Sequence, residues 1–209
     1  IKKRGEDVAE VWKLWLANVR TPRYNYGDMR AMISGVELGV TRLQEMTAKY
    51  GREVFKTTVG QLMDYSEARM RAELNDIPNG KYSFADYMDN DGVSESEIRI
   101  EAHCYVQGDE VVIDYTGSTA QVAGPINATL GVAWSAAYNA VLHLPDPSIP
   151  KNSGCFRPIR IVAPKGTIVN VDYPAPEVGG NTETHPRIAG AVIAALAQAA
   201  PERAMAGEG

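Results

Sequence analysis

The chain has 209 residues, of which 44% are hydrophobic and 22% are charged, and its formal net charge is −5 at pH 7. These values are ordinary for a globular protein, and the length allows one large domain or two small ones. The acidic balance disfavours a nucleic-acid surface, which usually needs a basic patch. The longest mainly apolar segment, residues 188–200, is too short to span a bilayer. We therefore expect neither nucleic acid nor a membrane as a partner.

Cysteine usage indicates a reducing compartment. The two cysteines, Cys104 and Cys155, are far apart in sequence, and we expect free thiols in a cytoplasmic protein. No Cys or His pair has the spacing of a structural zinc site, so the sequence predicts no metal ligands. The chain starts at Ile1 rather than at a start residue, and we expect it to be a section of a larger subunit.

Three amphipathic helices are predicted in the first part of the chain, over 6–19, 29–50 and 53–76, with a turn at 21–28. Asp28 is expected to cap the second helix and Gly51 to end it. Its apolar stripe, expected to face a core, contains Met32, Ile33, Val36, Val40, Leu43, Met46 and Tyr50. The stripe of the third helix contains Phe55, Val59, Leu62, Met63, Ser66, Met70 and Leu74.

After residue 78 the apolar period changes from 3.6 to 2, which indicates strands. A strand over 81–88 precedes an antiparallel hairpin of 97–106 and 111–115 that turns at Gly108-Asp109. The remaining predicted elements are a helix over 129–143, short strands over 158–163 and 167–171, and a helix over 186–200.

This order of elements predicts an α+β fold. We expect an N-terminal helical subdomain packed on a mixed, largely antiparallel sheet with further helices. The predicted domains are 1–78, the helical subdomain, and 79–209, an α+β region with the hairpin, short strands and two helices.

The segment EVGGNTETHPR, residues 177–187, is the strongest local signal. Paired glycines allow close backbone approach, and Pro186 suits the first turn of a helix, whose N–H groups favour anions. On local chemistry alone a capped helix is the commoner explanation than a site. The run at 89–92, DNDG, lacks the ligand spacing of a calcium loop and is interpreted as a turn. No phosphate loop, dinucleotide fingerprint or nucleophile elbow is present.

Six longer segments together resemble the hydantoinase B/oxoprolinase family. They are NVRTP at 18–22, GDMRAMISG at 27–35, YSEARMRAEL at 65–74, DYTGSTAQVAGPINAT at 114–129, NSGCFRPIRIVAPKGTIVN at 152–170 and GGNTET at 179–184. The resemblance spans residues 11–203. The family includes B-type subunits of N-methylhydantoinases, 5-oxoprolinases and the large subunits of acetone and acetophenone carboxylases.

The resemblance implies an ATP-dependent multi-subunit enzyme acting on a small molecule. An A-type ATPase subunit is the implied partner, and a small third subunit is a further expectation. ATP and a divalent metal are implied for the full complex, with the metal ligands outside this chain, so no cofactor is expected on this segment alone. The segment ISGVELGVTRL, residues 33–43, is more similar to the ketone-carboxylase branch. We therefore expect a section of a ketone carboxylase that converts a phosphorylated enol and activated bicarbonate to a 3-oxo acid.

Two alternatives stay open: a B-type subunit that opens a cyclic amide, and a scaffold section without catalytic groups. If this section lines a site, an anionic phosphorylated intermediate needs N–H donors nearby. The catalytic residues suggested under the resemblance are Asn181, Glu183 and His185. The suggested substrate-binding residues are Gly179, Gly180, Thr182 and Asn127.

Overall fold

The structure is a computed structural model that describes residues 1–204. The chain divides into two compact units, Ile1–Val59 and Gly60–Gly209. The predicted domains of this chain, 1–78 and 79–209, stay a prediction. No helix in residues 1–204 combines the length and the apolar character that a membrane crossing requires.

The first unit has a small aromatic core. Strands β1 (Lys2–Lys3) and β2 (Glu6–Asp7) form a hairpin, followed by α1 (Ala9–Ala17). Trp12 of α1 is only 7% exposed. Its ring lies edge-on to Trp15, with centroids 5.9 Å apart, and 5.1 Å from the ring of Tyr26.

Helix α2 (Pro22–Tyr50) begins earlier than the sequence pattern predicted. Pro22 occupies the first turn, where a missing N–H costs no hydrogen bond, so the expected turn at 21–28 is helical and Asp28 is not its cap. No residue of α2 is buried. The apolar stripe of α2 is therefore not buried within residues 1–204.

Helix α3 (Arg52–Asn75) runs from the first unit into the second. Its buried residues are Ser66, Met70 and Leu74, which all lie in its C-terminal half. Val59 and Leu62 are 41% and 46% exposed. The predicted inward stripe is thus confirmed only where α3 meets the core of the second unit.

The second unit is built on a four-stranded mixed sheet, which confirms the α+β prediction. Its strands are β3 (Gly80–Met88), β4 (Ile98–Gln107), β5 (Glu110–Asp114) and β6 (Ile159–Val162), in that spatial order. The first three pair antiparallel, whereas β6 runs parallel to β5. The predicted strand over 167–171 is absent, because Thr167 makes only single bridges, to Ala120 and Asn170, beside the turn at Gly166.

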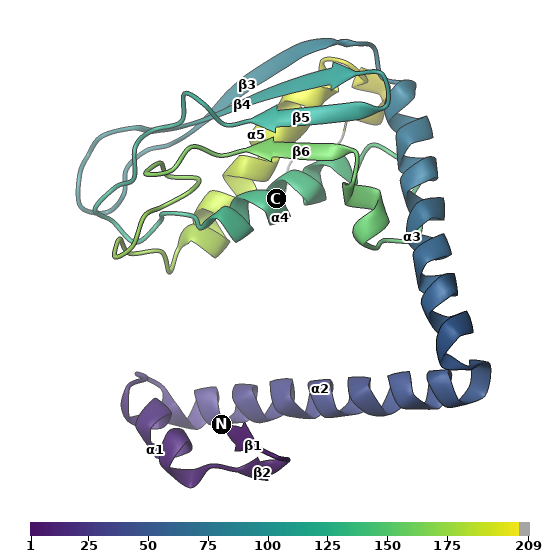
Figure 1. Ribbon diagram of the computed structural model, residues 1–209. Coiled ribbons are helices and arrows are strands. Elements are labelled where there is room, and N and C mark those ends of the chain that lie inside the picture. Colours follow the sequence, from purple (N-terminus) through teal and green to yellow (C-terminus); the bar gives the residue numbers. More distant parts are fainter. Residues whose placement is uncertain (205–209) are drawn as a thin grey trace. The chain divides into compact units, whose positions relative to one another are not determined.

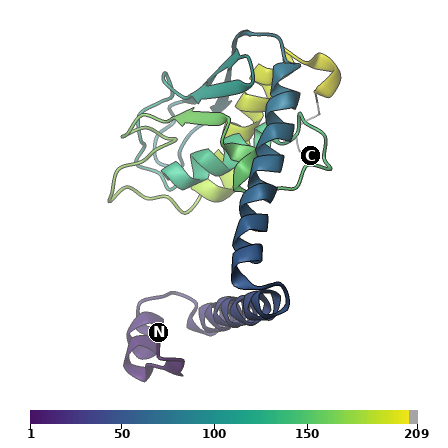
Figure 2. The same ribbon diagram turned by 45° about the vertical axis from the view of Figure 1, so that its right-hand side comes forward.

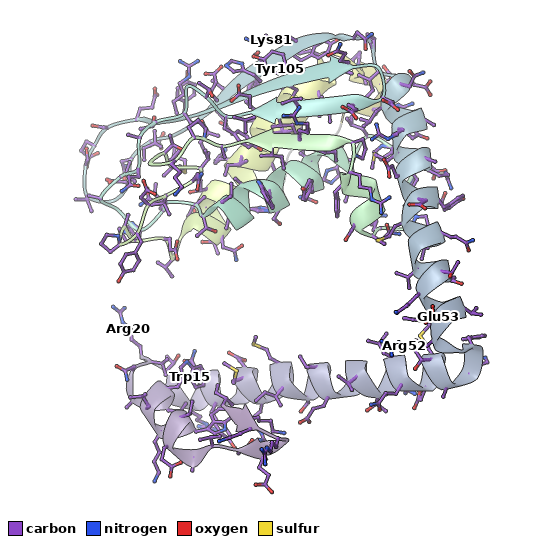
Figure 3. All side chains as sticks on the ribbon, in the orientation of Figure 1. Trp15, Arg20, Arg52, Glu53, Lys81 and Tyr105 are labelled. Atoms are coloured by element: carbon purple, nitrogen blue, oxygen red, sulfur yellow. The ribbon has the colours of Figure 1, made fainter. Side chains whose placement is uncertain are left out.

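Two helices cover one face of this sheet, α4 (Leu130–Val141) and α5 (His185–Ala197) (Figures 1 and 2). Alternate residues of β4, from Ile98 to Val106, point into the core between the layers. The helices meet it with small side chains, including Ala136 and Ala140 of α4 and Ala191 of α5. Small residues let helices approach closely. The opposite face carries Lys81 and Tyr105, whose ammonium nitrogen and ring centroid are 5.4 Å apart (Figure 3).

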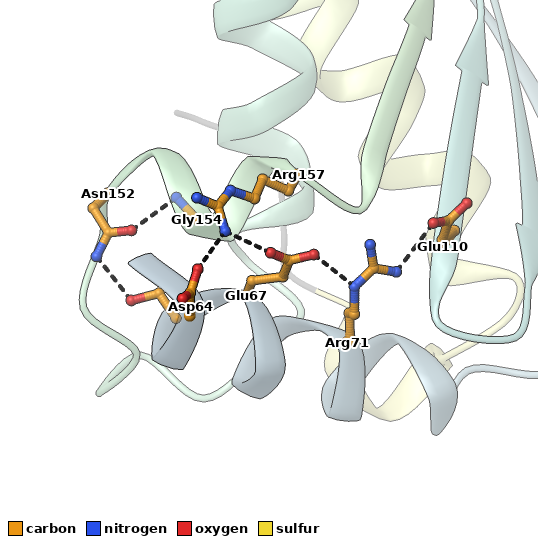
Figure 4. A network of polar contacts seen from close by, with 8 residues as sticks. Asp64, Glu67, Arg71, Glu110, Asn152, Gly154 and Arg157 are labelled. Carbon is orange, nitrogen blue, oxygen red and sulfur yellow. Dashed lines mark hydrogen bonds and ion pairs between the residues drawn. The ribbon is translucent and has the colours of Figure 1, made fainter. Parts of the chain in front are cut away.

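Residues 1–204 also contain three short helices: η1 (Ser153–Phe156), the π-turn η2 (Gly180–Thr184) and η3 (Pro201–Arg203). A polar network ties η1 to α3 (Figure 4). The Arg157 guanidinium donates to Asp64 and Glu67, both at 2.8 Å. Glu67 also accepts from Arg71 at 2.9 Å, and these two arginines hold the pKa of the Glu67 carboxyl below its usual value.

We predict that Gly154→Ala destabilises the second unit. A Cβ atom at this position would lie 1.9 Å from the backbone oxygen of Met63, so α3 and η1 must separate. We expect a loss of about 1–3 kcal/mol of unfolding free energy, as for other overpacked sites, measured by urea denaturation. Gly131→Ala is the matched control, because its Cβ would meet only Thr129 Oγ1, at 3.8 Å. Equal stability of the two variants would contradict the prediction.

Candidate functional site

Three connecting segments meet at one end of the sheet (Figure 1). They are 89–97, which follows β3, 115–129, which follows β5, and 172–184, which precedes α5. The antiparallel and parallel pairings place the C-terminal ends of β3, β5 and β6 and the N-terminal end of β4 at the same end of the sheet. Segments far apart in the sequence are therefore brought together here.

Asn127 is the centre of this arrangement. Its side chain is fully buried and accepts from the backbone N–H of Val122 at 2.8 Å. Its amide group donates to the carbonyls of Val122, Gly124 and Pro176, at 2.9, 3.1 and 2.8 Å. All four hydrogen bonds of the Asn127 side chain are made with backbone groups. It therefore holds two of the segments together and offers no group to a substrate.

Asp91 links the first segment to the second. One carboxylate oxygen accepts from the N–H groups of Val93 and Ser94, at 2.9 and 2.6 Å, and the other from Gly124 at 2.8 Å. The backbone bonds from Ser94, Val93 and Gly124 lower the pKa of the Asp91 carboxyl. A Cβ atom on Gly124 would lie 1.9 Å from the Asp91 carbonyl oxygen, so this contact needs glycine.

The paired glycines close the third segment onto the second. The N–H of Gly179 donates to Pro125 at 2.6 Å, and a Cβ on Gly180 would lie 2.1 Å from the Asn127 carbonyl oxygen. The buried Thr184 hydroxyl donates to the Ile126 carbonyl. The close approach suggested by the sequence is thus an approach of backbone to backbone.

Three polar side chains of the π-turn η2 form no hydrogen bonds that would give them a structural role within residues 1–204. Asn181, Thr182 and Glu183 are exposed, and no hydrogen bond of their side chains occurs within residues 1–204. Helix α5 has no side-chain cap at its N-cap residue, Thr184. The simple explanation of these residues as helix caps therefore does not hold.

A hollow of about 440 Å³ lies beside this turn. It is lined by Tyr87, Met88, residues 89–92, Ile126, Glu183 and Arg187. The Arg187 side chain is 55% exposed, and its guanidinium lies 3.7 Å from the Asp86 carboxylate, which is a loose ion pair. The hollow thus combines an exposed carboxylate with an exposed cation, a pair suited to proton transfer and to binding an anionic group.

Of the residues suggested from the sequence, Glu183 alone lines the hollow. Asn181 and Thr182 are exposed on the same turn, and His185 is half-buried at the start of α5. Gly179, Gly180 and Asn127 hold the segments in place. Sequence reasoning missed Arg187 and Asp91. Arg187 lies four residues after Glu183, one helical turn away, which is a usable signal. The contact between Asp91 and Gly124 has no local signal.

No group of three or more His, Cys, Asp or Glu residues within 1–204 is arranged to hold a metal ion. The divalent metal implied by the family resemblance therefore has no ligand set among the described residues, and no chemical step is assigned to it here.

Comparison with known proteins agrees with the resemblance. The sequence profile of the family described as hydantoinase B/oxoprolinase matches residues 1–209. A protein of Pseudomonas sp. (strain NS671) assigned as the B-type subunit of a D-/L-hydantoinase is 36% identical over 95% of this chain and 35% of its own length. The beta chain of the caprolactamase of Pseudomonas jessenii is 33% identical over 99% of this chain and 36% of its own length. The chain thus spans about a third of the length of these relatives.

Solved structures show the same fold. The crystal structure of the ATP-dependent caprolactamase from Pseudomonas jessenii matches 96% of this chain and 34% of that chain, with a TM-score of 0.87 and 32% identity. The nucleotide-free structure of an acetone carboxylase matches 97% of this chain and 28% of that chain, with a TM-score of 0.85 and 17% identity. The second likeness concerns the fold alone.

We predict that Asp91 makes stability depend on acid pH. Its folded pKa is lowered, so its contribution is present above the unfolded value, about 4, and is lost as the pH falls through the folded value. Asp91→Asn should therefore flatten the fall of unfolding free energy as the pH drops below about 4, measured by urea denaturation at each pH. The exposed neighbour Asp89 provides the control variant, Asp89→Asn, which should keep the wild-type fall. An unchanged slope in Asp91→Asn would refute the assignment.

Proposed function

This chain belongs to the hydantoinase B/oxoprolinase family, and we propose that it forms part of a B-type subunit of an ATP-dependent enzyme that opens a cyclic amide. The observation that carries this proposal is the identity of about a third to the B-type hydantoinase relative and to the caprolactamase beta chain, over nearly the whole chain. The predicted ketone carboxylation is supported by the resemblance of residues 33–43 and, among the comparisons, by a fold likeness at 17% identity. We therefore place cyclic-amide opening first.

The proposed chemistry divides between two subunits. An amide carbonyl resists attack by water, and phosphorylation of its oxygen by an A-type ATPase partner would activate it. Residues 1–204 contain no phosphate loop, so ATP chemistry is assigned to that partner. A small third subunit and a cytoplasmic location stay predictions from the sequence.

Groups at the hollow suit the step that follows. Water adds to the activated carbon while Glu183 takes its proton and passes it to the ring nitrogen. The ring C–N bond then breaks as the new hydroxyl group gives its proton to the nitrogen, which leaves an acyl phosphate, and a second water cleaves this acyl phosphate to the carboxylate and inorganic phosphate. Arg187 stabilises the negative charge on the phosphorylated intermediate, and the Asn181 amide donates a further hydrogen bond. Thr182 and His185 flank these groups. In this proposal Gly179, Gly180 and Asn127 act by fixing the turn.

The first test of this proposal is the choice of substrate. We expect the complete B-type subunit, mixed with its A-type partner, to hydrolyse ATP when hydantoin, 5-oxoproline or caprolactam is added. Acetone with bicarbonate should not stimulate hydrolysis. The measurement is phosphate release with product analysis, and omission of the B-type subunit is the control. Stimulation by the ketone alone would overturn the order proposed here and favour the carboxylase.

The second test concerns the turn itself. We predict that Glu183→Gln and Asn181→Ala each lower kcat of the complete complex by about 10²-fold or more, as for a lost general base or oxyanion donor. Melting temperatures should stay near wild type, because neither side chain makes a hydrogen bond within residues 1–204.

The matched control is Glu177→Gln, since Glu177 is an exposed carboxylate of the same segment that does not line the hollow. Its kcat should be unchanged. Normal turnover in all three variants would mean that this section is a scaffold, which is the remaining alternative.

A further inference from the structure

Asp86 and Arg187 form an ion pair beside the hollow, and the position of Asp86 is unusual for a carboxylate. Asp86 lies in β3, and its cross-strand partner is Ile100 of β4, which points into the core. Cross-strand partners share a face of the sheet, so the Asp86 side chain, at 28% exposure, lies on the face that the helices cover. Tyr82 and Met88, at alternate positions of β3, pack against the core on this face. A half-buried charge at such a position is costly unless it is compensated.

The position of Arg187 is also unfavourable for its charge. Arg187 lies in the first turn of α5, where the helix dipole places partial positive charge. This turn, which lies wholly within residues 1–204, contains no acidic residue that would offset a cation. An arginine at this position therefore does not serve the stability of the helix. Groups that break local preferences are expected at functional sites.

The pair is oriented without being joined by a hydrogen bond. Asp86 Oδ1 accepts from the backbone N–H of Tyr87 at 2.8 Å, which fixes the carboxylate on its strand. Asp86 Oδ2 lies 3.7 Å from Nη1 of Arg187, and a Cβ atom on Gly190, one turn further along α5, would also lie 3.7 Å from it. A separation of 3.7 Å exceeds that of a hydrogen bond. The guanidinium is thus attracted to Asp86 while its N–H groups are not committed to the carboxylate.

Other arginines of the second unit form closer contacts. Arg157 donates to Asp64 and Glu67, both at 2.8 Å, and Arg71 donates to Glu67 at 2.9 Å. These contacts use N–H groups of the guanidinium to hold α3 in place. The guanidinium of Arg187, by contrast, keeps its planar set of donors available for an anionic group in the hollow that this side chain lines.

We propose that Asp86 is a positioning residue that orients Arg187 toward the hollow. Asp86 holds the guanidinium by charge alone, and Arg187 donates its N–H groups to the phosphorylated intermediate. This inference rests on the proposed function, because it takes the anion in the hollow to be that intermediate. It applies equally to an activated amide and to a phosphorylated enol, since both carry a phosphate group.

A double-mutant cycle on kcat of the complete complex tests this coupling, with whichever substrate stimulates ATP hydrolysis. We expect Asp86→Asn to lower kcat by about three- to tenfold and to cause no further loss in an Arg187→Ala background. Asp86→Glu should restore most of the rate, because the longer side chain keeps a negative charge near Arg187. A merely structural role of Asp86 would instead lower the melting temperature and reduce kcat equally in both backgrounds.

The matched control is Asp109→Asn. Asp109 also pairs with an arginine, Arg71, at 3.2 Å, but it lies in the turn between β4 and β5, at the opposite end of the sheet. The kcat of this variant should equal that of the wild type. Normal turnover in Arg187→Ala would overturn the role of Arg187 in the proposed function and this inference with it. Slow turnover in Arg187→Ala, combined with normal turnover in Asp86→Asn or with equal losses in both backgrounds, would overturn this inference alone.

Discussion

The buried carboxamide of Asn127 is the contact on which the functional end of the sheet depends. It forms hydrogen bonds with one backbone N–H and three backbone carbonyls from two of the segments. An unsatisfied buried polar group costs about 1–3 kcal/mol, so the segments cannot separate cheaply. Because Gly180 packs directly on the Asn127 carbonyl, the position of the π-turn follows from this contact.

The π-turn η2 is fixed to the rest of the second unit at its two ends. Gly180 and Thr184, at its two ends, are buried and fixed to the second segment, whereas the three residues between them are exposed. Rigid anchors with free polar side chains between them are what a binding or catalytic turn needs, since the anchors fix geometry and the free groups keep their hydrogen bonds for a ligand. Gly180 and Thr184 thus position the turn, and Glu183, between them, lines the hollow.

Local patterns in the sequence predicted those elements whose structure is set by residues close to them in the sequence. The strict alternation from Ile98 to Val106 identified β4 because burial on one face is a local property of a strand. The start of α2 was missed because Pro22 was taken as part of a turn rather than as the first helical residue. Glu183, which lines the hollow, lies in a segment that was singled out from the sequence. The link from Asp91 to Gly124 was not, because it joins residues 33 apart through the pleat and register of the whole sheet.

The two units differ in how far their apolar side chains are buried. In the second unit, the stripes of α4 and α5 are buried against the sheet, and the gain of burial supports both helices. In the first unit, α2 has 29 residues and buries none of them fully. Most helical stability in proteins comes from packing of an apolar face. The stability of a helix of this length therefore depends on whether its apolar stripe is covered.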